Sequence, residues 1–323
     1  MQYVFSDYIM NFFSFLISKI YRIPIYLRHY LSNEIVINGY FFYNDDGSLK
    51  NNNFGDDINF PLIRELTGKQ VRQEWKVGLK NLENILCIGS IIDCCNEHSL
   101  IWGAGAISDN IIMHHTPKKI YAVRGPLTRK LLLEYRIDCP EIYGDPALLL
   151  PLIYAPKTEK KYKYGFIPHC IDYDLPHVVK FREEHPEILF IKFEGYTSWH
   201  NVIDLINSCE NIISSSLHGL IVSDAYGIPN VRIMLSDNIV GGDFKYKDYY
   251  GGVKRKYRDP VDCRVEIEFD KIIDEFRYSE KISFNAQKLL KTFPYKLRHK
   301  YKMLVNNNQG IIVSCINETK YTH

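Results

Sequence analysis

The stretch of sequence that decides the fold is Ser214-Ser215-Ser216-Leu217-His218-Gly219-Leu220, followed by Gly227 and Pro229. Residues 211–215 have the apolar character of a short buried strand, and residues 217–226 place apolar side chains at helical spacing. Ser216 is therefore the expected N-cap, while Gly227 suits a left-handed helix end and Pro229 cannot continue a helix. The stretch predicts a strand, a tight hydroxyl-rich turn and a helix in direct succession.

This turn is a candidate anion site. The free N–H groups at a helix N-terminus carry partial positive charge, which favours a bound phosphate or carboxylate. We therefore expect Ser215, Ser216 and Gly219 to contact an anionic donor. His218 lies in the first turn, where a protonated imidazole is disfavoured, and it is the first candidate for acid–base work. The alternative is that His218 only hydrogen-bonds a loop at the helix start.

The composition limits the classes of protein that are plausible. A chain of 323 residues is long enough for two domains. Its net charge of +2, from 40 basic and 38 acidic residues, argues against nucleic acid as the main partner. The eight cysteines show no paired metal-ligand spacing, so we expect reduced thiols, a cytoplasmic protein and no metal.

Short buried strands alternate with helices along the chain, which predicts an α/β fold with parallel sheets in two Rossmann-like domains. The expected strands cover residues 34–43, 84–90, 100–103, 119–123, 163–168, 188–193 and 211–215. A charged, proline-bearing segment after residue 151 predicts the domain boundary. The predicted parts are an extension over 1–33, domains over 34–155 and 156–260, and a helical tail over 261–323 that crosses back.

Residues 3–20 are apolar and aromatic but are interrupted by polar side chains. They are too polar for a spanning helix and lack the features of a secretory signal. With the basic residues that follow, residues 1–33 can contact an anionic membrane surface from the cytoplasmic side. Packing against the body of the protein is the alternative.

Two further segments carry candidate binding residues. Arg124 follows the strand over 119–123, at the sheet edge where α/β proteins bind ligands, and an Arg there can hold a phosphate or carboxylate. A surface ion pair is the alternative for Arg124. Residues 241–250 predict a loop in which Lys245 or Lys247 meets an anion and aromatic side chains such as Tyr246 and Tyr249 support a sugar ring. A rigid surface loop is the alternative.

Five motifs, in chain order, resemble the polysaccharide pyruvyl transferase family. They lie within residues 34–252 and are Asn53-Phe54-Gly55-Asp56-Asp57, Trp102-Gly103-Ala104-Gly105, Val123-Arg124-Gly125-Pro126-Leu127-Thr128, Gly144-Asp145-Pro146-Ala147-Leu148-Leu149 and Ser214-Ser215-Ser216-Leu217-His218-Gly219. The resemblance implies two domains facing a cleft, as in the glycosyltransferase B architecture. It also implies transfer of a pyruvyl group from phosphoenolpyruvate to a sugar as a cyclic ketal, with release of phosphate.

This chemistry needs an acid for the methylene carbon and a base for a sugar hydroxyl. His218 is the expected base, and the carbon acid is left open between Asp57, Asp145 and His169. Arg124 and the helix start at Ser216 would hold the donor. No cofactor is expected besides the donor substrate phosphoenolpyruvate.

The expected acceptor is a sugar of a surface polysaccharide precursor, with lipid linkage left open. Asn53, Tyr246 and Tyr249 are the residues expected to contact it. A nucleotide-sugar-dependent glycosyltransferase is the alternative enzyme, because one fold hosts both reactions. A non-catalytic sugar-binding protein is a third reading.

Overall fold

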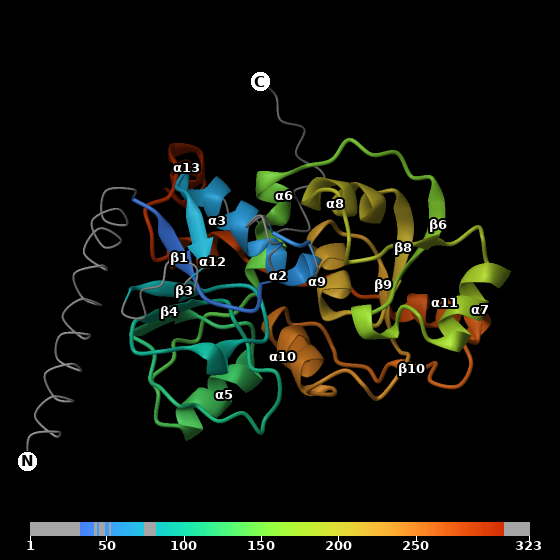
Figure 1. The fold of residues 1–323 in the computed structure, drawn as a ribbon, viewed down its shortest axis with the longest axis horizontal. Coiled ribbons are helices and arrows are strands. Elements are labelled where there is room, and N and C mark those ends of the chain that lie inside the picture. The colour runs from blue at the N-terminus through green and yellow to red at the C-terminus, as the bar shows by residue number, and fades with distance from the viewer. Residues whose placement is uncertain (1–32, 42–43, 45–48, 52, 74–81, 307–323) are drawn as a thin grey trace, which may run out of the picture.

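The structure is a computed structural model that describes residues 33–41, 44, 49–51, 53–73 and 82–306. It is an α/β protein with two parallel five-stranded sheets, which lie beside each other in Figure 1. The first sheet has the order β2(Val71–Gln73), β1(Ile35–Ile37), β3(Asn84–Leu86), β4(Ser99–Trp102), β5(Lys119–Ala122). The second has the order β10(Val261–Asp262), β9(Asn230–Met234), β8(Cys209–Ser214), β6(Tyr162–Ile167), β7(Leu189–Phe190).

Both sheets have the same topology. In each, the first strand in the chain lies between the second and the third, and the fourth and fifth extend the far edge. The direction of winding therefore reverses between β1 and β3, and again between β6 and β8. Ligands of doubly wound sheets bind at the carboxyl ends of the strands at such a reversal. The fold thus offers one binding edge from each sheet.

The helices connect successive strands and cover the sheets. Their bounds are α2(Phe54–Asp57), α3(Asn59–Thr67), α5(Pro126–Glu134), α6(Leu150–Ile153), α7(Pro176–Glu184), α8(Trp199–Asn207), α9(Leu217–Ala225), α10(Phe244–Gly252), α11(Phe269–Glu275), α12(Ala286–Lys291) and α13(His299–Asn306). Helix α9 has its N-cap at Ser216, and Gly227 has a φ of +67°, so both predicted helix ends are confirmed.

The prediction of a loop over 241–250 is wrong, because residues 244–252 form helix α10. The prediction of one helical tail also needs correction. The second sheet extends past residue 260 to include β10, and residues 279–285 separate α11 with its following 3-10 turn from α12. Strand β10 pairs with β9 in parallel, which explains why residues 261–262 leave the helical state.

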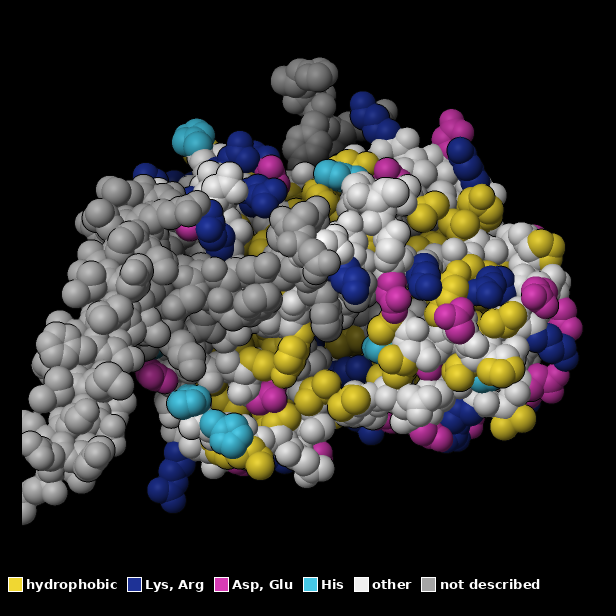
Figure 2. Space-filling view, in the orientation of Figure 1, with side chains coloured by type: hydrophobic (Ala, Val, Ile, Leu, Met, Phe, Trp, Pro, Cys, Tyr) yellow, Lys and Arg dark blue, Asp and Glu magenta, His cyan; other side chains and the backbone are white. Residues whose placement is uncertain are grey.

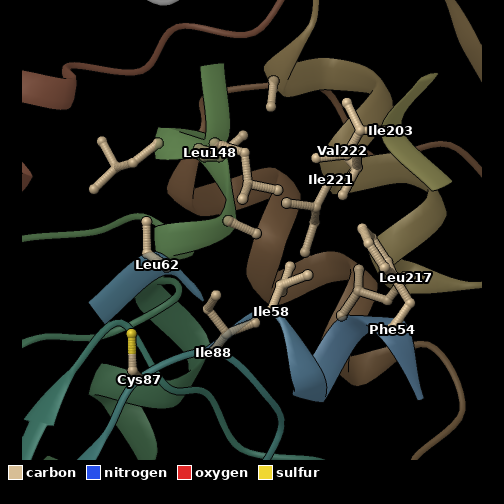
Figure 3. Close-up of a cluster of buried hydrophobic side chains, with 14 of the residues drawn as sticks. Phe54, Ile58, Leu62, Cys87, Ile88, Leu148, Ile203, Leu217, Ile221 and Val222 are labelled. Carbon is tan, nitrogen blue, oxygen red and sulfur yellow. The ribbon is translucent and has the colours of Figure 1, made fainter. Parts of the chain in front are cut away.

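One continuous hydrophobic cluster joins the two sheets. Phe54 and Ile58, at the start of the helical segment after β1, lie in the same cluster as Leu217 and Ile221 of α9. Figure 3 shows these side chains from the two halves packed against one another, with Leu148 beside them. All five are buried, so the α9 N-terminus is held against α2 by apolar contact.

Helix α10 makes buried polar contacts with both halves of the molecule. It follows β9 of the second sheet in the chain but packs on α5 of the first half. Arg124, which is 0% exposed, donates from Nε to Asp248 Oδ2 at 3.0 Å, and Thr128 donates to the same carboxylate from its backbone N–H and its hydroxyl. On its other side, Tyr246 Oη donates to the Ser215 carbonyl at 2.6 Å. Helix α10 therefore binds both halves of the molecule.

The C-terminal helices return to the first sheet. Trp102 Nε1 of β4 donates to the Leu289 carbonyl of α12 at 3.1 Å, and the Arg298 N–H donates to the Leu66 carbonyl of α3. Figure 1 shows α12 and α13 next to α3 and β1, at the opposite end of the chain from their neighbours. The last described helices thus cover the first half rather than the second.

Two predictions concern residues outside the described ranges. The predicted membrane contact through residues 1–33 concerns residues 1–32, which lie outside the described residues. The final part of the predicted helical tail, after residue 306, also lies outside them. Among the helices of the described ranges, none combines the length and the apolar character that crossing a bilayer requires.

We expect Asp248→Ala to lower the free energy of unfolding by about 3–5 kcal/mol, because it leaves the buried Arg124 guanidinium without its counter-charge. The measurement is guanidinium chloride unfolding followed by circular dichroism. Asp262→Ala is the matched control, since it removes an exposed ion pair with Arg264, and we expect it to cost less than about 1 kcal/mol. Equal losses of unfolding free energy for the two variants would show that the buried Arg124–Asp248 ion pair does not stabilise the fold.

Candidate active site

The carboxyl ends of the reversal strands converge on one hollow between the two sheets. The first half supplies helix α2 and the turn after β3, and the second supplies His169 after β6 and the N-terminus of α9 after β8. Figure 2 shows this face of the molecule hollowed between the two halves, with basic and histidine side chains inside. The topology therefore brings these segments together at the carboxyl ends of the strands.

His218 packs directly on helix α2 of the opposite half. A Cβ atom at Gly55 would overlap its imidazole ring, so only glycine allows this approach. Its Nε2 atom is buried and has no hydrogen-bond partner among the described residues. Burial, together with the positive charges of Arg124 and Lys245, lowers the pKa of His218 to about 3. The ring is therefore a neutral base whose Nε2 atom has no hydrogen-bond partner within the described ranges.

The α9 N-terminus beside His218 keeps its own donors open. Ser216 occupies the N-cap position but its side chain caps no backbone N–H. Its neighbour Ser214 instead accepts the N–H of Ser216 at 3.0 Å. A helix leaves its first N–H groups without partners inside the helix. Those of α9 face the hollow and can donate to a ligand there.

Lys245 brings a cation into this hollow from α10. Its side chain is 7% exposed, and within the described ranges its ammonium group has no hydrogen bond or ion pair. Burial and the nearby guanidinium groups of Arg124 and Arg232 lower the pKa of Lys245 to about 8, against the attraction of Asp56. An unpaired buried cation is costly unless an anion comes to meet it. The anion contact expected of Lys245 stays a prediction.

His169 faces the same hollow after β6. Its backbone N–H donates to Ser215 Oγ at 2.8 Å, and its Nδ1 accepts from the Ile171 N–H at 3.4 Å. Because Nδ1 acts as the acceptor, we assign the ring proton to Nε2. Burial and Lys245 lower the pKa of His169 to about 4. It is therefore a neutral hydrogen-bond donor.

Asp56 is the residue that sequence reasoning missed. Its Oδ2 accepts from Asn53 Nδ2 at 2.6 Å, and a methyl group at Gly89 would lie only 3.2 Å from its Oδ1. Burial and the neighbouring carboxylates of Asp57 and Asp145 raise the pKa of Asp56 to about 7, although Lys245 opposes this. The signal was present in the sequence as a Gly-Asp-Asp helix start, where successive residues point in directions about 100° apart.

Asp57 and Asp145, the two carboxyl groups expected as candidates for the carbon acid, each accept a hydrogen bond from another residue of the protein. Asp57 Oδ2 accepts from the Tyr196 hydroxyl at 2.7 Å, which turns it away from His218 and towards the segment before α8. Asp145 is 1% exposed, with Oδ1 accepting from the Ala147 N–H at 2.9 Å. Burial raises the pKa of Asp145 to about 6. The Oδ2 atom of Asp145 is buried and has no hydrogen-bond partner among the described residues. Asp57 is therefore engaged by Tyr196, whereas Asp145 keeps one carboxylate oxygen without a partner and stays a candidate for the carbon acid.

The expectation that Arg124 holds the phosphate or carboxylate of the donor needs correction. Besides Asp248, its guanidinium donates to Ser90 Oγ and to the Ala106 carbonyl, each at 2.6 Å. The side chain is wholly buried and packs on Gly105. Because its Nε, Nη1 and Nη2 atoms all have partners, Arg124 influences a ligand through its field rather than by contact. The alternative of an ion pair holds, although the pair is buried and not at the surface.

Four more predicted contact residues have structural roles. Ser215 is fully buried and its hydroxyl bonds His169 and Asp172, while Gly219 allows α9 to approach Ser214. Tyr246 and Tyr249 are buried in the core, and Tyr249 Oη donates to Asp224 at 2.7 Å. Neither ring has a face open to a sugar, which corrects the expected acceptor platform. The residues that do gather in the hollow are His218, His169, Ser216, Lys245 and Asp56, with Asn53 orienting Asp56.

No three His, Cys, Asp or Glu side chains of the described ranges gather closely enough to hold a metal ion.

The contact between Gly55 and His218 predicts a double-mutant result. We expect Gly55→Ala alone to destabilise the protein, because the new methyl group displaces the His218 ring. In a His218→Ala background the same change is expected to be neutral or to stabilise by up to about 1 kcal/mol, since Ala is the better helix former. Denaturant unfolding of the four proteins measures this coupling. If the two changes were additive, the packing of His218 on α2 would be wrong.

The similarity of this chain to known proteins agrees with the geometry. Residues 99–237 match the polysaccharide pyruvyl transferase family. The chain is 26% identical over 216 residues to the uncharacterized protein L143 of Acanthamoeba polyphaga mimivirus, covering 64% of this chain and 74% of that protein. It is 28% identical over 232 residues to the succinoglycan biosynthesis protein ExoV of Rhizobium meliloti, covering 66% of each. The matched region begins at β4 and ends after β9, so it includes Arg124, Asp145, His169 and His218. The predicted resemblance is thereby confirmed for residues 99–237, which match the polysaccharide pyruvyl transferase family.

Proposed function

We propose that this protein transfers the pyruvyl group of phosphoenolpyruvate to two hydroxyls of a sugar in a polysaccharide precursor, forming a cyclic ketal and releasing phosphate. The observation that carries the proposal is the unpaired, buried Lys245 beside the open N-terminus of α9 and the neutral His218. The family of residues 99–237 and the likeness to a succinoglycan biosynthesis protein support it. In this proposal the two α/β halves act as the facing domains of a glycosyltransferase B-like architecture.

The donor's phosphate would be held by the N–H groups at the start of α9, by Ser216 Oγ and by Lys245. The ammonium group supplies a full charge, and the helix terminus supplies directed donors. His169 Nε2–H adds a neutral donor on the same side. When an anion binds here it raises the pKa of His218 above that of the empty site, because a negative charge favours the imidazolium form. Donor binding thus makes His218 a stronger base.

Asp56 is our choice for the carbon acid. Its pKa of about 7 leaves a substantial fraction of the carboxyl protonated at neutral pH, while its place beside Lys245 keeps it close to the bound donor. Asp57 Oδ2 accepts from the Tyr196 hydroxyl. Asp145, whose Oδ2 has no partner among the described residues, is the second candidate for the carbon acid. A protonated carboxyl and a neutral imidazole in one site form an acid–base pair set by their environments.

The proposed reaction conserves protons. Asp56 gives its proton to the methylene carbon, so that C2 becomes cation-like and the carbon becomes a methyl group. The first sugar hydroxyl attacks C2 while His218 takes its proton. The bond between C2 and the phosphate oxygen then breaks, its electron pair leaves with phosphate, and His218 protonates the phosphate. The second hydroxyl attacks C2, closes the ketal and returns its proton to Asp56.

The decisive experiment measures phosphate release from phosphoenolpyruvate with galactosyl-, glucosyl- and mannosyl-terminated acceptors, with mass spectrometry of the products. We expect His218→Ala to lower kcat by about 100- to 10,000-fold, the usual contribution of acid–base catalysis. Lys245→Met is expected to raise KM for phosphoenolpyruvate, whereas Lys247→Met is its matched control. Lys247 lies on the same helix but is 47% exposed and paired with Asp243.

If the acceptors gain no pyruvyl ketal, the proposal is wrong. Transfer from a nucleotide sugar instead would assign the protein to the alternative class, the glycosyltransferases. Equal effects of Lys245→Met and Lys247→Met would remove Lys245 from the donor site.

The pH dependence tests Asp56 separately. Because its pKa is raised to about 7, the acid form that the reaction needs is present at lower pH and is lost as the pH rises through 7. We expect kcat/KM for phosphoenolpyruvate to fall above that pH in the wild type, and to fall from a lower pH in Asp57→Asn, because the Asp57 charge helps to raise the pKa of Asp56. Lys245, with a pKa of about 8, adds a separate fall, so the decisive comparison uses a Lys245→Met background, in which Asp56→Asn should remove the remaining basic limb. A basic limb that persists in that double variant would assign the carbon acid to another group.

A further inference from the structure

A second cavity is lined in part by Asp57 of α2, the helix on which His218 packs. Its volume is about 570 Å³, within the range of small-molecule sites. Its walls come from both halves of the molecule: from the first, residues 49 and 51, α2, α3 and β2, and from the second, the segment 196–199 at the start of α8. None of the residues assigned above to donor binding lines it.

Asp57 and Tyr196 form the boundary between this cavity and the catalytic hollow. Both line the cavity, and their hydrogen bond of 2.7 Å joins the two halves there. Asp56, the neighbour of Asp57 in the chain, belongs to the hollow. A ligand that fills the cavity therefore reaches Asp57, which is next to Asp56 in the chain.

The cavity wall combines flat aromatic surfaces with polar groups that lack partners. Phe60, Tyr196 and Trp199 contribute the aromatic side chains. Gln73 is 3% exposed, and its Oε1 atom has no hydrogen-bond partner among the described residues although its Nε2 bonds the Gly39 carbonyl. Arg64 is exposed at the cavity and, within the same ranges, its guanidinium has no ion pair.

These properties match a sugar ring better than an apolar ligand or a nucleotide phosphate. A pyranose presents one apolar face to an aromatic ring and hydroxyl groups to amides and guanidinium groups at its edge. A buried amide oxygen without a partner favours a ligand that brings a hydroxyl donor. The cavity wall includes no free helix N-terminus of the kind that binds phosphate at α9, because Ser198 Oγ caps α8 by accepting the Asn201 N–H at 3.2 Å.

We propose that this cavity binds the saccharide unit of the acceptor that is linked to the sugar receiving the pyruvyl group. The inference rests on the proposed function for its biological meaning, since it assigns the second subsite of the same acceptor. Trp199 supplies the stacking surface, and Gln73 and Arg64 bond the hydroxyls. The acceptor is then recognised as at least a disaccharide, and a single sugar fills only the part of the site near His218.

The test is direct binding of the full-length protein, without phosphoenolpyruvate, to a glycan array, followed by calorimetric titration with the best disaccharide and with its terminal monosaccharide. We expect Trp199→Ala to weaken disaccharide binding by about fivefold or more, and Trp199→Phe to retain most of it. Arg64→Ala should also weaken it. Tyr278→Ala and Lys130→Ala are the controls, because both side chains are exposed outside this cavity and should leave affinity unchanged.

The outcomes separate this inference from the proposed function. Loss of disaccharide affinity in Trp199→Ala and Arg64→Ala, with KM for phosphoenolpyruvate unchanged, supports the subsite. The same loss in a protein that shows no pyruvyl transfer keeps the saccharide site and overturns only the reaction. Unchanged affinity in both variants overturns the subsite even if pyruvyl transfer occurs. Absence of binding to every glycan on the array also overturns it.

Discussion

The buried ion pair between Arg124 and Asp248 is the constraint on which the rest of the structure depends. Asp248 lies on α10, which follows the second sheet in the chain, whereas Arg124 follows β5 of the first sheet. A charge buried without its partner costs several kcal/mol, so the pair holds α10 against the first half, while the bond from Tyr246 to the Ser215 carbonyl holds it against the second. Three residues before Asp248, the same helix carries Lys245 into the hollow. The position of Lys245 therefore depends on this ion pair.

Charge and burial together set the protonation state of the hollow. The charges of Arg124 and Arg232 act on Lys245, and those of Asp57 and Asp145 act on Asp56. Together with burial, the cations lower the pKa of His218 and the carboxylates raise the pKa of Asp56. Within the described part of the chain, the site thus holds a base that is neutral, an acid that is partly protonated and a cation without a partner. An anionic donor would relieve this imbalance, so donor binding and the preparation of the catalytic groups are one electrostatic event.

The two parallel sheets explain why the reacting groups come from distant parts of the sequence. Because each sheet reverses its winding between its first and third strands, each presents one open edge, and the continuous apolar cluster around Phe54 and Leu217 holds the edges together. Gly55 lets the two halves approach until the His218 ring rests on α2. The cavity beyond Asp57 lies along the same junction, which would place an extended acceptor across both halves.

The sequence by itself determined the features that depend on neighbouring residues. Apolar periodicity, the cap at Ser216 and the stop at Gly227 predicted the β8–α9 unit, because capping and periodicity act within a few residues. Tertiary structure decided the rest. Residues 244–252 carry two terminal glycines and several aromatic side chains, which favour a loop locally, and the burial of Asp248 and Tyr246 stabilises them as a helix. It also decided that Asp56 rather than Asp57 faces the hollow, and that Arg124 is occupied by Asp248, because both depend on which elements pack together and not on which residues are adjacent.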